Sequence, residues 1–425
     1  MNAKFVCKGD VVFSIDQEHM QSIEQGFVVC EDGICMGAYD ELPAEYAQYP
    51  VVDCGKNLIF PGMTDLHVHA PQYTFRGLGM DCELLEWLQT YTFPEENKYR
   101  DMDYAREAYS YFAEDLKRGF TTRAVIFATI HNEATVELMD QLEETGLITY
   151  VGRVNMDRNG GSGLQEESAG SSLLGTRRWL EAVQGRYRNT MPILTPRFIP
   201  TCSDELMLGL GALAKEKSLR IQSHLSENPA EIAWVRELVP AADCYANAYE
   251  LFGHMGSEEL PTIMAHCVYS DAREMEILKA HGVYVAHCPD SNLNICSGIA
   301  PVRKLLDAGI HVGLGTDVAG GSSLNMVRTM LTTLQVSKMY HTLLERDCAP
   351  LTFEETFYLA TMGGGQYFGK VGSFRKGYEF DAVVADDSLM KSTRHLTPRE
   401  RAERMIYNDA DCMIRKKFVA GRQVL

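Results

Sequence analysis

The chain has 425 residues, of which 45% are hydrophobic and 23% charged, and its formal net charge is -18. This length fits one large domain plus a smaller one, and the composition is that of a globular protein. The acidic balance argues against a nucleic-acid partner, because proteins that bind nucleic acid concentrate positive charge.

Short apolar strands separated by turns occur at both ends of the chain. Residues 1–60 contain two such strands on either side of Glu31-Asp32, which predicts a hairpin. Residues 371–425 contain two more, Asp381–Ala385 and Lys417–Gly421. Neither group is large enough to hold a core alone. We therefore predict one small β-sandwich domain formed from both chain ends.

Residues 61–370 follow a different pattern, in which apolar strands alternate with helical stretches such as Met102–Arg118 and Asp204–Lys217. The predicted strands are Leu58–His69, Thr121–His131, Ile148–Asp157, Pro192–Phe198, Leu219–Glu227, Thr262–Cys267, Val283–His287 and His311–Asp317. Such βα repeats predict an α/β protein with a closed (β/α)8 TIM barrel. An open doubly wound sheet is the alternative, but no Gly-x-Gly-x-x-Gly follows the first strand.

Polar residues fall at the ends of several predicted strands. His67 and His69 are two residues apart, so they point to the same side of an extended strand and form half of a metal site. This spacing alone is weak evidence. Other strands end in Arg197-Phe198, in His224 to Glu227, in His266 and in Asp317. A closed barrel gathers the carboxyl ends of its strands at one mouth, and three histidines with an aspartate make a plausible zinc shell.

These motifs carry a resemblance to a known family. Pro61–His69, followed by His224, His266 and Thr316-Asp317, resembles the amidohydrolase superfamily, and the resemblance covers nearly the whole chain. More narrowly, several stretches are similar to the members of that superfamily that deaminate guanine. They are His69–Tyr73, Leu84–Leu88, Tyr91–Pro94, Phe127–His131, Thr195–Phe198, Gln222–Glu227 and Thr316–Gly321.

The resemblance implies that residues 61–370 are a metal-dependent hydrolase barrel. It also implies that His67, His69, His224 and Asp317 bind one Zn²⁺ per chain, with Fe²⁺ as the alternative metal. Related two-metal members carry a modified lysine at the end of the fourth strand. Here that strand ends in Arg197, which stays protonated and cannot bridge two metals, so one metal is favoured.

The implied activity is hydrolytic deamination of guanine to xanthine and ammonia, in purine catabolism or salvage. A zinc-activated hydroxide would attack C2 of guanine, and Glu227 would protonate N3. Asp317 would accept the proton of the water and pass it towards ammonia, while His266 stabilises the developing charge. Glu227, Asp317 and His266 are thus the expected catalytic residues, and Glu227 and Asp317 would also contact the substrate.

Purine selection is expected from Gln72, Arg197 and Phe198. An arginine fork matches the paired acceptors O6 and N7 of guanine, whereas adenine has an amino group at C6. Gln72 can donate and accept, and Phe198 can pack on the ring. Simpler explanations are that Arg197 forms a structural ion pair, that Gln72 bonds the backbone, and that Glu227 is a carboxylate near a helix start.

The sequence alone is also compatible with two other functions. One is a different deaminase or hydrolase of the same fold, acting on a triazine, cytosine, adenosine or S-adenosylhomocysteine. The other is an inactive scaffold, although every expected ligand is present here.

The 12 cysteines show no Cys-x-x-Cys pair, which favours free thiols in the cytoplasm. No membrane segment is expected, and the resemblance implies a homodimer.

Overall fold

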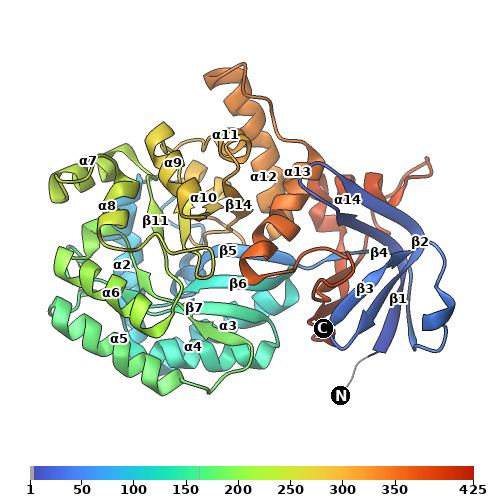
Figure 1. Cartoon of the computed structure of the whole chain (residues 1–425), viewed down its shortest axis with the longest axis horizontal. Helices are drawn as coiled ribbons and strands as arrows, with labels where there is room; N and C mark the ends of the chain where they lie inside the picture. Colours follow the sequence, from blue (N-terminus) through green and yellow to red (C-terminus); the bar gives the residue numbers. More distant parts are fainter. Residues whose placement is uncertain (1–3, 162) are drawn as a thin grey trace.

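The computed structural model describes residues 4–161 and 163–425. Met1–Ala3 of the predicted N-terminal segment therefore lie outside the described residues. A large α/β part lies beside a smaller sheet, and both chain ends belong to that smaller sheet (Figure 1). No helix in the described ranges is long and apolar enough to cross a membrane.

The smaller sheet combines strands from both chain ends. In spatial order they are β17 (Arg422–Gln423), β16 (Met413–Val419), β15 (Ala382–Asp386), β4 (Val51–Pro61), β1 (Lys4–Ser14), β2 (Met20–Glu31) and β3 (Ile34–Tyr39). The predicted β unit of both ends is thus confirmed, as is the hairpin at Glu31-Asp32. The expected two-sheet sandwich is not, because the described strands form a single seven-stranded sheet. The reason is that β4 pairs with β1 on one side and β15 on the other.

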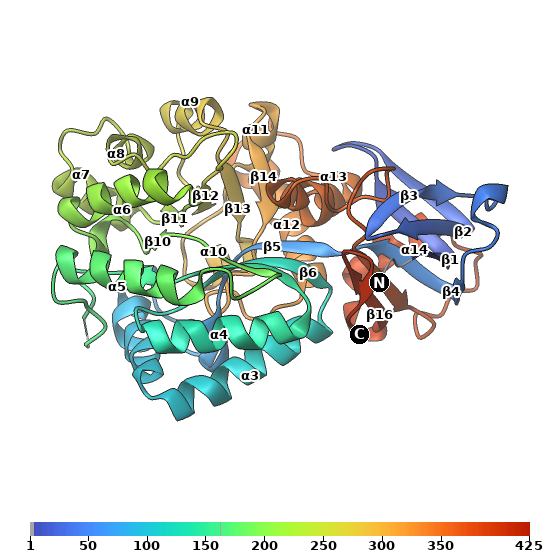
Figure 2. The same ribbon diagram turned by 60° about the horizontal axis from the view of Figure 1, so that its bottom comes forward.

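The larger part contains parallel sheets, which confirms the α/β class. One sheet consists of β5 (Met63–His69), β6 (Thr121–Phe127), β7 (Ile148–Gly152) and β9 (Thr190–Pro192). A second consists of β11 (Gln222–Leu225), β12 (Ile263–His266), β13 (Tyr284–His287) and β14 (His311–Leu314). The strands β8 (Val154–Asn155) and β10 (Thr195–Pro196) pair with each other and form a separate two-stranded sheet. Figure 2 shows the strands surrounded by helices.

The ladders of the described strands do not form one continuous ring. The predicted strand Pro192–Phe198 is divided into β9 and β10, because the backbone N–H groups of Ile193 and Leu194 between them donate to different neighbours, the carbonyls of Val151 and Arg220. Two links nevertheless join the sheets. An isolated bridge pairs Leu194 with Ile221, and the Asp317 backbone N donates to the His67 carbonyl at 2.8 Å.

Helices cover the outer face of the parallel strands (Figures 1 and 2). The main ones are α3 (Met102–Arg118), α4 (Asn132–Thr145), α5 (Ala169–Val183), α6 (Asp204–Lys217), α7 (Pro229–Leu238), α8 (Tyr245–Leu251), α9 (Ala272–Ala280), α10 (Pro289–Asn294), α11 (Val302–Asp307), α12 (Met326–Met339) and α13 (Phe353–Tyr358). A further helix, α14 (Pro398–Tyr407), packs against β1 and β2 of the terminal sheet. Two of these, α3 and α6, begin and end at the predicted residues.

The predicted strand Leu58–His69 is in fact two strands, and this break positions the histidines. β4 ends at Pro61 in the terminal sheet, and β5 starts at Met63 in the α/β part. Gly62 lies between them, and a Cβ there would come within 2.2 Å of the Thr122 side chain. Only glycine fits this crossing. The domain limits at residues 60 and 370 remain a prediction.

Candidate active site

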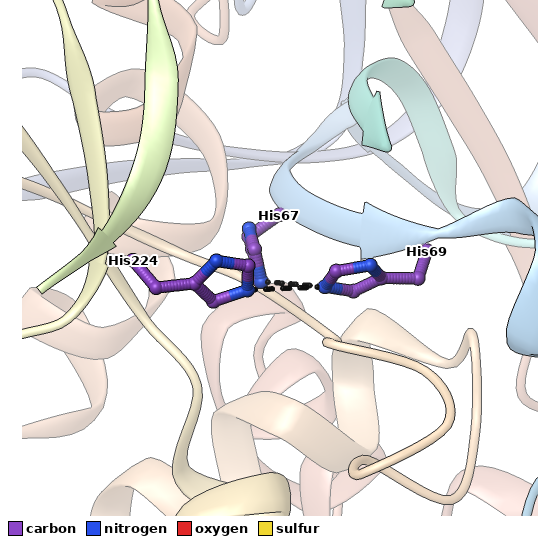
Figure 3. A group of neighbouring side chains, drawn as sticks. All are labelled: His67, His69 and His224. Carbon is purple, nitrogen blue, oxygen red and sulfur yellow. Dashed lines mark hydrogen bonds between the residues drawn. The ribbon is translucent and has the colours of Figure 1, made fainter. Parts of the chain in front are cut away.

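Three histidines converge at the carboxyl ends of two parallel strands. His67 and His69 close β5, and His224 lies near the end of β11 (Figure 3). The Nε2 atom of His69 lies 3.2 Å from that of His67 and 3.2 Å from that of His224. The structure therefore brings together the three histidines that the sequence singled out.

Asp317 completes this cluster from the turn after β14. Its Oδ1 lies 3.1 Å from Nε2 of His67 and 3.5 Å from Nε2 of His69. Burial lowers the pKa of His67, His69 and His224 well below the usual value, so each ring is neutral and has a lone pair. With its proton on Nδ1, each ring turns the Nε2 lone pair towards the other two, and nitrogen with carboxylate donors fit zinc. These residues thus fit a metal ion.

A hydrogen bond to the backbone fixes the orientation of the His224 ring. Its Nδ1 lies 2.7 Å from the Arg197 carbonyl, which can only accept, so Nδ1 carries the proton and Nε2 is free as a ligand. A second possible donor, the Cys288 thiol, groups with His67 and Asp317. Burial raises the pKa of that thiol well above its usual value, and its Sγ donates to the Ala286 carbonyl at 3.3 Å.

Acid–base groups lie directly beside the histidine cluster. Nε2 of His266 is 3.3 Å from Oε2 of Glu227 and 3.7 Å from Oδ2 of Asp317. Asn292 Oδ1 accepts from Nδ1 of His266 at 2.9 Å, which orients this ring as well. Burial, reinforced by Asp317, raises the pKa of Glu227 to about 8. Glu227 is therefore protonated at neutral pH and can act as an acid.

The turns that present these groups have strained backbones. Ser226, His266 and Asp317 have φ values of 47°, 75° and 46°, in the left-handed region that side chains other than glycine disfavour. Such conformations cluster where the surrounding structure fixes a functional group. His266 ends β12 and Asp317 follows β14, and both side chains line the cavity, whereas the Ser226 hydroxyl donates to Glu274.

A cavity of about 410 Å³ opens over these groups. It is lined by His69, Gln72, Leu84, Trp87, Leu88, Arg197, Phe198, His224, Glu227, Glu231, His266, Ser291, Ile295 and Asp317. Every predicted site residue lines the cavity except His67, which lies beneath it in the metal cluster. The apolar wall of the cavity comes mainly from α1 (Leu84–Trp87) and the adjoining Leu88.

Two predicted substrate contacts, Arg197 and Gln72, already have protein partners. Arg197 forms a buried ion pair in which Nη1 donates to Glu96 Oε2 at 2.7 Å and Nη2 to Oε1 at 3.0 Å. Gln72 Nε2 donates to the same Oε1 at 2.8 Å, and Gln72 Oε1 accepts from the Ala319 backbone N at 3.1 Å. The sequence offered two simpler explanations, a structural ion pair for Arg197 and a backbone hydrogen bond for Gln72. Both interactions exist, and both lie within the cavity wall.

Sequence reasoning missed three polar residues that support the site: Glu96, Asn292 and Glu231. Their partners explain why. Glu96 pairs with a residue 101 positions away, and Asn292 orients a histidine 26 positions away. Glu231 did leave a local signal, because Asn228 and Glu231 form a capping box at the start of α7.

Comparisons with known proteins agree with this geometry. The family model described as "Amidohydrolase family" matches residues 58–424. The guanine deaminase of Dictyostelium discoideum is 35% identical over 415 residues, which is 96% of this chain and 91% of that protein. The guanine deaminase of Homo sapiens is 36% identical over 379 residues, 86% of this chain and 82% of that protein.

A solved structure extends the similarity to the whole fold. Guanine deaminase from C. acetobutylicum, with guanine bound in its active site, superposes with a TM-score of 0.95 at 40% identity and covers 99% of this chain and 100% of that one. The strand-end ligands, the cavity and these similarities lead to one assignment. The chain belongs to the amidohydrolase family, and its relatives there include guanine deaminases.

Proposed function

We propose that this protein is an enzyme that deaminates guanine hydrolytically to xanthine and ammonia. One observation carries the proposal. A cavity of about 410 Å³ joins a three-histidine and aspartate cluster to a buried acid, Glu227, and to purine-matching donors on Arg197 and Gln72. Relatives with the same whole-chain fold have this activity by name. The reaction consumes guanine and so belongs to purine catabolism.

His67, His69, His224 and Asp317 would hold one metal ion, for which zinc is our proposal and Fe²⁺ the alternative. A bound zinc lowers the pKa of a coordinated water to about 7 and so supplies a nucleophile at neutral pH. The neutral state of the buried rings supports this role. The Cys288 thiol, with its raised pKa, is left out of the ligand set.

Glu227 would donate its proton to N3 of guanine as the water oxygen bonds to C2. Two features support the role of acid. Its raised pKa keeps it protonated at pH 7, and Ser297 Oγ donates to Oε1 at 2.9 Å. Oε2 is then the oxygen that faces His266 and the cavity. The proton stays on N3 in xanthine, and the last proton of the attacking water restores the acid.

Asp317 would move the other proton. Its two oxygens face different partners, since Oδ1 lies beside the histidine cluster and Oδ2 faces His266. One oxygen can therefore hold the ion while the other takes a proton from water and delivers it to the amino group, which leaves as ammonia. His266, with Nδ1 held by Asn292, would stabilise the charge that develops beside it.

Gln72, Arg197 and Phe198 would select guanine. Phe198 lines the cavity, so its ring would pack on the flat face of the base. Glu96 takes one hydrogen from each Nη of Arg197, and Met156 Sδ lies 3.8 Å from Nη1. Among the contacts of the described residues this leaves the second Nη2 hydrogen and the Nε hydrogen for guanine O6 and N7.

The proposal is tested by product analysis in water labelled with ¹⁸O. The metal-loaded enzyme should convert guanine to xanthine with one equivalent of ammonia, and xanthine should carry one ¹⁸O atom at C2. Mass spectrometry and an ammonia assay measure both. Guanine that stays unchanged, or xanthine without the label, would contradict hydrolytic deamination by this protein.

The proposal also covers the closure of the barrel, the cellular compartment and the oligomeric state. The two links between the parallel sheets support a closed (β/α)8 barrel. All 12 cysteines are free, which favours a reducing compartment and hence the cytoplasm. A homodimer is expected from the resemblance, and light scattering of the purified protein would give twice the 47.6 kDa chain mass.

A further inference from the structure

A buried carboxylate, Glu96, lies behind the cavity wall. It ends the short helix α2 (Phe93–Glu96) and has no exposed surface. Glu96 does not line the cavity, but both residues that it bonds, Arg197 and Gln72, do. Any effect of Glu96 on a bound purine must therefore pass through these two side chains.

Glu96 fixes the direction of the Arg197 guanidinium. The two hydrogen bonds to Nη1 and Nη2 form a fork in which guanidinium and carboxylate are held together. The Phe93 ring lies 5.0 Å from the Arg197 Cζ and adds a cation–π contact from the same helix. With one edge of the guanidinium occupied, only the remaining N–H groups are available to a ligand.

Glu96 also fixes which way the Gln72 amide points. A carboxylate can only accept, so the atom of Gln72 that faces Glu96 at 2.8 Å must be the NH₂ group. The amide oxygen then faces the Ala319 N–H at 3.1 Å. An amide free to flip would present either a donor or an acceptor to the base. Here only one of these orientations satisfies both neighbours.

We propose that Glu96 is a positioning residue that sets purine selectivity, because it orients the donors of Arg197 and the amide of Gln72 together. This inference rests on the proposed guanine deaminase function. Its consequence is specific, since Glu96 should govern the reading of the guanine O6 and N7 edge. A purine without O6 keeps only N7 for the arginine, so its binding should depend on Glu96 less than that of guanine does.

The test is the Glu96→Gln variant, which keeps the side-chain size but places an NH₂ group against Arg197. The readouts are kcat and KM for guanine and the inhibition constant of 2-aminopurine, which has the same amino group but no O6. We expect KM for guanine to rise roughly tenfold to a hundredfold, the size of one lost charge-assisted contact. The affinity for 2-aminopurine should fall clearly less than that for guanine, and the zinc content should stay near wild type.

The matched control is Asp381→Asn. Asp381 is also a buried carboxylate that binds an arginine through two bonds, at 2.7 Å and 3.2 Å to Arg123, but it lies outside the cavity. This variant should lose stability without any change in the ratio of guanine to 2-aminopurine affinity. It thus separates the loss of a buried ion pair from the loss of orientation.

The outcomes are distinct. Equal weakening of guanine and 2-aminopurine by Glu96→Gln, or an unchanged KM, would overturn the inference while wild-type turnover of guanine upholds the function. No wild-type turnover would instead remove the function itself. If Glu96→Gln does not fold, the change is made in the Gln72→Leu, Arg197→Met background, in which both side chains that Glu96 orients are already removed. A guanine KM within about threefold of that background alone then supports the inference, and a larger further loss overturns it.

Discussion

At the scale of single residues, two neighbouring carboxyl groups have the same raised pKa but different roles. Glu227 and Glu231 both have a pKa raised to about 8 by burial. Glu231 accepts from the Tyr245 hydroxyl and from the backbone N–H groups of Glu227 and Asn228, so its oxygens are occupied by the protein. Glu227 has one oxygen facing the catalytic cluster, and only Glu227 is positioned to transfer a proton.

This difference predicts the effect of Glu227→Gln. Glutamine keeps the shape but has no acidic proton, so kcat should fall by about 10² to 10⁴. Metal content, measured by elemental analysis, should be unchanged because Glu227 is not among the proposed ligands. Steady-state turnover of guanine is the readout. Wild-type turnover in this variant would remove Glu227 from the role of acid.

The sequence predicted the residues at strand ends and missed those that act from a distance. His67, His69, His224, His266 and Asp317 could be found because the carboxyl ends of parallel strands meet. Glu96 could not, since its role depends on Arg197 in a different part of the chain. Long-range polar pairs leave no periodic or local pattern in a single sequence.

At the scale of elements, local signals fixed helices better than strands. The helix α3 begins after Asp101, whose side chain accepts from the backbone N of Asp103 at 2.9 Å, and it ends at Arg118, directly before Gly119. These signals lie in the sequence itself. The split of Leu58–His69 into β4 and β5 depends instead on which sheet each half joins, and that is decided by tertiary pairing.

The N-cap of α3 gives a prediction at this scale. Asp101→Ala removes the side-chain acceptor for two backbone N–H groups and should lower the free energy of unfolding by about 1 kcal/mol. Asp103→Ala is the control, because Asp103 is exposed and forms only a surface ion pair with Arg106. Denaturant titration of both variants gives the comparison, and equal losses would argue against the cap.

At the scale of the whole molecule, buried charges join the terminal sheet to the α/β part. Arg123 in β6 binds Asp381, which directly precedes β15. Lys417 in β16 has no exposed surface, and its Nζ donates to the carbonyls of Lys117 at 2.6 Å and Thr121 at 2.9 Å. The first of these carbonyls belongs to the last turn of α3. Because these contacts bridge both parts, we expect the chain to unfold as one unit.

Lys417 makes this junction sensitive to pH. Burial lowers the pKa of Lys417 from 10.5 to about 7. Between these values the unfolded chain keeps the proton that the folded chain has lost, so stability rises with pH, by at most about 1.4 kcal/mol per pH unit. Lys417→Met abolishes this contribution. The free energy of unfolding of the wild type should therefore increase relative to this variant from pH 7 to pH 9, and parallel curves would contradict the lowered pKa.

The most direct test of the account is ultraviolet absorbance of the zinc-loaded protein with guanine, adenine, cytosine and adenosine in parallel samples. We expect that only guanine changes, that ammonia is released, and that chelation abolishes turnover until zinc is restored. Turnover of another base in place of guanine would leave the fold and metal cluster intact but contradict the roles of Gln72 and Arg197. Turnover of guanine that survives complete metal removal would contradict the role of the histidine cluster.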